Sequence, residues 1–77
     1  MKEYLIRFLD NRLELARATT ATRSLVRTYE NQAYGALAFY LEACYYENKA
    51  QEEEVLDNLW NDYYHTEFFN AWLEKTE

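Results

Sequence analysis

The fold is decided by residues 22–47, which read TRSLVRTYENQAYGALAFYLEACYYE. The stretch holds one Gly and no Pro, and its apolar residues recur in alternating steps of four and three. That spacing is typical of the a/d positions of a heptad helix, which packs against other helices. The residues concerned, called here the heptad seam, are Leu25, Tyr29, Gln32, Ala36, Phe39, Ala43 and Tyr46. We expect one long helix over residues 22–47, with the seam on a buried side that Val26, Ala33, Leu37, Tyr40 and Cys44 widen.

A second apolar stripe lies far round the same helix and consists of Tyr34, Ala38, Leu41 and Tyr45. A helix that is apolar on two sides is buried on two sides. Either the neighbouring helices or a second subunit covers this stripe. Gly35 costs about 1 kcal/mol relative to Ala inside a helix. It is either a tolerated residue or the mark of a close helix crossing.

Residues 2–18 form an amphipathic pattern and predict a first helix. Arg12 is the one charged residue that projects into its apolar side. It either extends its charged end to water or forms an ion pair with a carboxylate of the third helix or a second chain. The run Thr19-Thr20-Ala21-Thr22 favours a short connection, because hydroxyl residues are good helix caps. A continuous helix through this point is the alternative.

Residues 51–75 predict a third helix, and Asn48 with Gln51 has the spacing of a capping box. An acidic patch near its start consists of Glu52, Glu53, Glu54 and Asp57. Carboxylates stabilise the first turn of a helix, although a cation or a protein partner would also suit such a patch. The apolar pattern changes side after Tyr63. The helix therefore breaks near His65 or is apolar nearly all round at its end.

The composition excludes several classes of protein. One Cys excludes a disulfide framework, and one Gly without Pro disfavours phosphate-binding loops. Asp62 and His65 have a metal-ligand spacing, but no second copy of the motif exists. We expect no catalytic residue, no metal and no cofactor. With neither a signal peptide nor a membrane span in view, we expect a cytoplasmic chain.

Charge is distributed unevenly along the 77 residues. Residues 1–27 hold six basic and three acidic residues, a net charge of +3. Residues 28–77 hold two basic and eleven acidic residues, which gives −9 there and −6 in total. The halves either complement each other internally or present an acidic face to a basic partner, as an inhibitor or DNA mimic does. Residues 19–28 have the Thr, Ser and Arg content of a DNA-recognition helix, but the charge of −6 opposes nucleic-acid binding.

These patterns predict one all-α domain over residues 1–77, a small three-helix bundle or a helical hairpin with a third helix, completed by dimerisation. A bundle of this size gains stability from association, and exposed Tyr and Trp suit an interface. The expected function is that of a non-catalytic interaction or regulatory module that forms a twofold homodimer. The expected interface consists of Tyr34, Ala38, Leu41, Tyr45, Trp60, Tyr64, Phe68 and Trp72.

Overall fold

A computed structural model describes residues 2–75, which form three consecutive helical rods without a strand. Helix α1 spans Lys2–Arg17 and α2 spans Arg23–Tyr46. The third rod consists of α3 (Ala50–Leu59), η1 (Trp60–Tyr64) and α4 (His65–Leu73), which follow one another without interruption. The predicted all-α bundle and its helices are confirmed, with ends that differ by one or two residues.

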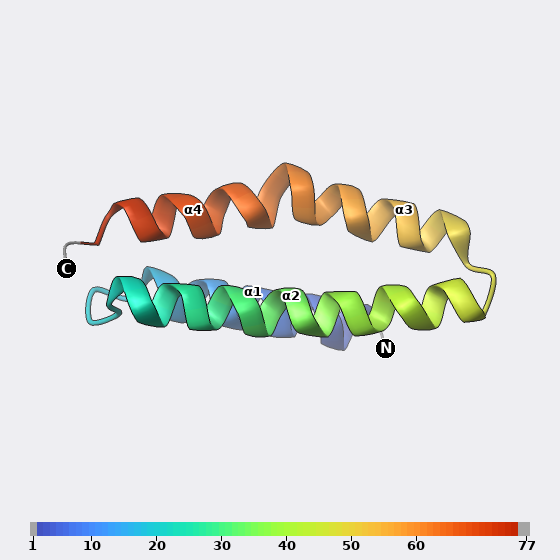
Figure 1. Cartoon of the computed structure of the whole chain (residues 1–77), viewed down its shortest axis with the longest axis horizontal. Coiled ribbons are helices and arrows are strands. Elements are labelled where there is room, and N and C mark those ends of the chain that lie inside the picture. Colours follow the sequence, from blue (N-terminus) through green and yellow to red (C-terminus); the bar gives the residue numbers. More distant parts are fainter. Residues whose placement is uncertain (1, 76–77) are drawn as a thin grey trace.

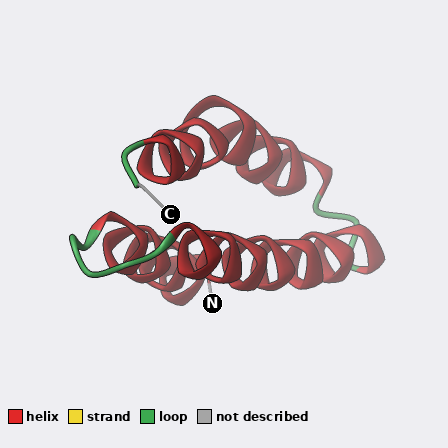
Figure 2. Cartoon of the chain, turned by 60° about the vertical axis from the view of Figure 1, so that its left-hand side comes forward, coloured by secondary structure: helices red, strands yellow, loops and turns green. Residues whose placement is uncertain are grey.

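The rods lie nearly side by side in a molecule that measures 43 × 19 × 16 Å. Figure 1 shows α1 and α2 as an antiparallel hairpin, with the third rod running along one side of it. Figure 2 shows the same two layers from another side. Because α1 has 16 residues and α2 has 24, the C-terminal turns of α2 extend beyond the start of α1. No helix within residues 2–75 is both long and apolar enough to cross a membrane.

The core lies where the three rods meet, and a different row of residues from each rod enters it. Its largest fully buried side chain is Phe68 of α4. The rows are Leu5, Leu9, Leu13 and Ala16 of α1; Val26, Ala33, Leu37 and Cys44 of α2; and Leu56, Trp60, Tyr64, Phe68 and Ala71 of the third rod. Each rod thus buries one apolar face, as amphipathic helices in a bundle do.

The first connection, between α1 and α2, is closed by helix-end hydrogen bonds. The Thr22 side-chain oxygen accepts a hydrogen bond of 3.2 Å from the Leu25 N–H, which makes Thr22 the N-cap of α2. The Lys75 ammonium donates to the Ala18 carbonyl at 2.6 Å, and Arg23 Nε donates to the Lys75 carbonyl at 2.9 Å. The predicted turn is confirmed, and a continuous helix through this point is wrong.

The second connection corrects the expected capping box at Asn48. The N-cap of α3 is Lys49, which makes no side-chain capping bond. Asn48 instead ends α2 in the left-handed conformation, with φ 58°. The Lys49 N–H donates to the Cys44 carbonyl and the Asn48 N–H to the Tyr45 carbonyl, the bond pattern of a Schellman motif. Asn suits this position because it tolerates a positive φ better than most residues do.

The change of side in the apolar pattern of the third rod is accommodated by a π-helical turn at η1, and the helix does not break there. The His65 N–H donates to the Trp60 carbonyl five residues back. In a regular helix of 100° per residue, Leu56 and Phe68 would point about 120° apart. The wider turn removes this difference, so that Leu56, Trp60 and Phe68 all reach the core. The end of the rod is nevertheless apolar on more than one side, as the alternative expects, because Phe68 and Ala71 are buried while Phe69 and Leu73 are exposed.

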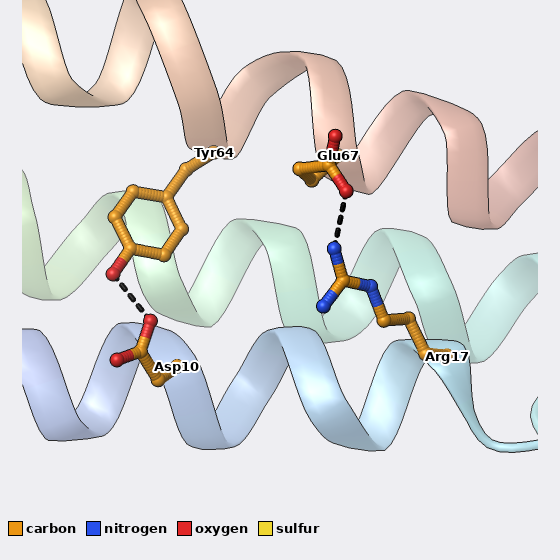
Figure 3. A network of polar contacts seen from close by, with 4 residues as sticks. All are labelled: Asp10, Arg17, Tyr64 and Glu67. Carbon is orange, nitrogen blue, oxygen red and sulfur yellow. Dashed lines mark hydrogen bonds and ion pairs between the residues drawn. The ribbon is translucent and has the colours of Figure 1, made fainter.

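An ion pair and a hydrogen bond connect the third rod to α1 (Figure 3). Arg17 forms an ion pair with Glu67, and the Tyr64 hydroxyl donates a hydrogen bond to Asp10. Burial, followed by the bond to Asp10, raises the pKa of Tyr64 well above its ordinary value. In the Arg17–Glu67 pair, a basic group of the N-terminal segment thus meets an acidic group of the remainder.

Candidate functional site

The structure leaves much of the heptad seam uncovered. Leu25, Phe39 and Tyr46 expose 41%, 78% and 73% of their surface, and Gln32, which completes this row of every seventh residue, is also exposed. The intervening seam residues Tyr29, Ala36 and Ala43 are half-buried. The expectation that the seam lies on the buried side of α2 is therefore wrong for the row through Phe39.

The residues that α2 does bury follow the seam by one position, about 100° round the helix. Val26 follows Leu25, Ala33 follows Gln32, and Cys44 follows Ala43. This row faces α1 and the third rod together, and small side chains suit a position between two neighbouring helices. The large aromatic residues of the seam are consequently left on the outer side.

An apolar groove of about 430 Å³ lies beside the seam, between α1 and the C-terminal half of α2. Its lining residues come from the start of α1, from the C-terminal half of α2 and from Lys49 after it. The groove, called here the α1–α2 groove, is lined by Tyr4, Leu5, Phe8, Ala36, Phe39, Tyr40, Ala43, Cys44, Glu47 and Lys49. Ala36, Phe39 and Ala43 belong both to this groove and to the heptad seam, so the two form one continuous apolar surface.

The groove has few polar groups. Glu47 and Lys49 pair with each other at 2.9 Å. Burial, followed by the charge of Glu52, raises the pKa of the Cys44 thiol, which keeps the thiol protonated. A nucleophilic cysteine requires the opposite shift. The groove therefore offers a mainly apolar lining with a protonated thiol.

Three of the eight residues expected at an interface lie in the core instead. Trp60, Tyr64 and Phe68 expose 5% or less of their surface, so they offer none to a partner. Their aromatic rings pack together, with the Trp60 and Phe68 ring centres 5.9 Å apart. The sequence pattern placed them on an outer side because it assumed a regular helix through η1.

The other five expected interface residues divide between covered and open positions. The ring centre of Tyr34 lies 5.2 Å from that of Trp60, yet Tyr34 still exposes 52% of its surface. Leu41 packs against the core and Trp72 is half-buried, whereas Ala38 and Tyr45 are exposed. The third rod thus touches the second stripe of α2 at Tyr34, but three of the four residues of the stripe remain exposed.

The acidic patch is partly used within the chain. Glu52 accepts a hydrogen bond of 2.7 Å from the Tyr40 hydroxyl. Glu53 is half-buried, while Glu54 and Asp57 are exposed. Glu54 and Asp57 are therefore the most open residues of the patch.

The basic residues singled out by the sequence serve packing in this structure. Of the two alternatives for Arg12, the ion pair is not formed within residues 2–75. Its guanidinium lies 4.5 Å from the centre of the Phe8 ring, a cation–π contact. Arg23, in the stretch expected of a DNA-recognition helix, lies 3.9 Å from the centre of the Trp72 ring.

The part of the chain that the structure describes brings no three metal-ligating side chains together. His65 is exposed, and its Nδ1 atom lies 4.0 Å from Glu30 rather than beside Asp62. The groove residues Tyr4 and Phe8 were not recognised as site residues from the sequence. They shared the apolar face of the first helix, and nothing in their spacing separates a core position from the edge of a groove.

Comparisons of the chain with family models, with curated proteins and with solved structures find no match. The assignment of a function therefore rests on the surface described above.

Proposed function

We propose that the protein is a non-catalytic helical interaction module that self-associates through the heptad seam. The observation that carries this proposal is the exposure of the row that contains Leu25, Phe39 and Tyr46. Their spacing is that of a helix–helix contact, yet no helix within residues 2–75 covers the row. An exposed row of large apolar residues costs solubility unless a partner buries it.

The chemistry of the surface supports association in a second way. The seam contains aromatic, aliphatic and one amide side chain, and none of its seven residues is charged. Protein interfaces show this composition at their centres, where charged residues are depleted and aromatic residues are enriched. Aromatic residues also dominate the energetics of interfaces, because each buries a large area. The adjoining α1–α2 groove supplies a concave wall for such side chains.

Sedimentation equilibrium at micromolar concentration tests the proposal. We expect the wild-type chain to sediment as a dimer and Phe39→Glu to sediment as a monomer, because a buried unpaired carboxylate is costly. Phe69→Glu is the matched control, since Phe69 is also more than half exposed but lies on α4. It adds the same charge and should leave the dimer intact. A strictly monomeric wild-type chain, or equal losses in both variants, would contradict the proposal.

A second candidate function is docking on a basic protein partner through the acidic part of the chain. The exposed carboxylates of Glu54 and Asp57 favour it, together with the net charge of −9 over residues 28–77. Binding of an oligolysine peptide should weaken steeply as salt is added, because exposed charges are screened. The double variant Glu54→Gln with Asp57→Asn should bind more weakly. Binding that does not respond to salt would exclude this function.

A further inference from the structure

The α1–α2 groove lies next to an arginine that has a buried donor without an acceptor. We propose that the groove binds a small apolar carboxylic acid, with the apolar chain between α1 and α2 and the carboxylate on Arg12. Such a ligand goes beyond the self-association proposed above and requires no second copy of the chain. Two independent features support it, namely the dimensions and lining of the groove and the hydrogen bonding of the Arg12 guanidinium.

The groove has the dimensions of a site for a short hydrocarbon chain. Its volume of about 430 Å³ lies within the range of roughly 300–1,000 Å³ that is usual for small-molecule sites. Along α2 its lining extends from Ala36 to Glu47, which corresponds to about 16 Å of helix. An extended hydrocarbon chain advances about 1.3 Å per carbon atom, so a chain of about twelve carbons matches this length.

The outer end of the groove, where α2 ends, is negatively charged. Lys49 pairs there with Glu47 at 2.9 Å, and the hydrogen bond to Glu47 raises the pKa of the Lys49 ammonium. Glu52 lies at the same end, because its carboxylate accepts the hydrogen bond of the Tyr40 hydroxyl, and Tyr40 lines the groove. Like charges in contact are destabilising, so a ligand carboxylate is disfavoured at this end.

The inner end of the groove lies beside Arg12. This residue is one turn after Phe8 on the same side of α1, and its guanidinium lies 4.5 Å from the centre of the Phe8 ring, which lines the groove. Its Nη1 atom donates to Asn11 at 3.1 Å, whereas its Nε atom is buried without an acceptor. None of the ion pairs within residues 2–75 includes Arg12. Because buried donors are nearly always hydrogen-bonded, Nε is a donor for which a ligand can supply the acceptor.

A carboxylate matches the guanidinium in shape as well as in charge. Its two oxygens accept from two parallel N–H groups, and this bidentate pair is among the strongest hydrogen-bonded contacts in proteins. A carboxylate on the edge formed by Nε and Nη2 of Arg12 would give Nε its acceptor. Because Nε is covered in the structure, the guanidinium has to turn on its flexible stem to present this edge. A neutral alcohol with the same chain cannot form the bidentate pair.

Titration with decanoate and with the neutral analogue decanol, followed by amide signals in nuclear magnetic resonance spectra, tests the site. We expect saturable shifts at the residues that line the groove. Arg12→Met should weaken decanoate binding about tenfold or more, because hydrogen bonds to charged groups are worth that much, and should leave decanol binding unchanged. Arg7→Met is the matched control, since Arg7 is an exposed arginine of α1 that also lies over a ring of the groove, that of Tyr4.

The pattern of losses decides the outcome. A selective loss of decanoate binding in Arg12→Met, with Arg7→Met like the wild type, supports the proposed site. Equal losses in both arginine variants indicate a general attraction of charge and overturn it. A selective loss in Lys49→Met places the carboxylate at the outer end and overturns it as well, as does the absence of saturable shifts in the groove. If Arg12→Met does not fold, Arg12→Lys replaces it, because lysine keeps the charge but cannot form the bidentate pair. Unchanged decanoate binding in Arg12→Lys would then overturn the proposal.

Discussion

Replacing Gly35 by Ala should stabilise the folded chain, which is the reverse of what most substitutions do. Gly35 lies near the middle of the 24-residue α2, and its surface is exposed. No glycine of the described chain has a positive φ, so an alanine adopts the same backbone without strain. The added methyl group would meet no atom within 4 Å. Neither a clash nor a new contact therefore contributes, and the change isolates helix propensity.

The expected gain follows from that propensity alone. Gly is about 0.8–1.0 kcal/mol less favourable than Ala in a helix interior. For a domain of this size, 1 kcal/mol shifts the midpoint of thermal unfolding by roughly 4–8 °C. We expect the midpoint of Gly35→Ala to rise by about that amount, measured by far-UV circular dichroism on samples dilute enough to be monomeric. Ala38→Gly, an exposed position of the same helix, is the reciprocal control and should lower the midpoint by a similar amount.

The two variants together can refute the reasoning. If Ala38→Gly lowers the midpoint as expected but Gly35→Ala fails to raise it in dilute samples, position 35 is not open and the folded chain uses the missing Cβ. A rise in dilute samples that disappears as the protein is concentrated has a different meaning. It would show that the methyl group is tolerated by the single chain but interferes with association at the centre of the seam.

Three further substitutions probe the connection, the core and the titratable contact with the acidic patch. Asn48→Val should lower the free energy of unfolding by about 1–2 kcal/mol in urea titrations, because a β-branched residue is strained at φ 58°, whereas Asn48→Gly should not lower it. Phe68→Ala should lower the free energy of unfolding by about 3–5 kcal/mol, which is a large share of the roughly 4–12 kcal/mol expected for 77 residues, and should lower the urea midpoint. A loss below about 1 kcal/mol would mean that the side chain is not buried. The hydrogen bond to Glu52 raises the pKa of Tyr40 from 10 to about 12, so the stability it contributes is complete below pH 10 and is lost as the pH rises towards 12. Tyr40→Phe should flatten that part of the curve of urea midpoint against pH, and an unchanged curve would show that the bond does not persist in solution.

The sequence was sufficient for the helices and for the first connection. Periodicity located α1 and α2 to within one or two residues, since Thr22 is a hydroxyl cap at a clear interruption of the pattern. Asn48 was misassigned, because the same residue favours both an N-cap and a left-handed helix end. Only the backbone bonds around Lys49 distinguish these two roles.

The predicted burial of Val26, Ala33, Leu37 and Cys44 is confirmed, but the sequence could not separate this row from the seam beside it. The heptad seam and the row through Val26 and Leu37 differ by about 100° round one helix, and both are apolar. Which of the two rows enters the core depends on how α1 and the third rod are placed around α2. That placement is decided by the packing of all three rods and not by α2 alone. The aromatic content of the seam made it resemble a core, whereas the narrow space between the rods selected the smaller residues.

The prediction that Trp60, Tyr64 and Phe68 lie at an interface is wrong for a related reason. A helical wheel assigns every residue the same rotation, and this assumption no longer holds inside η1. A π turn leaves only a weak mark in a sequence, here three successive steps of four between Leu56 and Phe68. On a regular helical wheel these steps predict that the apolar face moves to another side of the helix. In the structure the helix instead widens at η1, and the apolar face stays towards the core.

The π turn also defines how the third rod responds to a change in length. Its core residues follow steps of four, four, four and three from Leu56 to Ala71. Removal of one residue, such as the exposed Asn61, would leave steps of four, three, four and three, which is an uninterrupted heptad. The rod is in this sense a regular heptad helix that carries a one-residue insertion, absorbed within the helix instead of in a loop. A single-residue deletion, which usually disrupts a helical core, is here the change that would restore regular α-helical geometry.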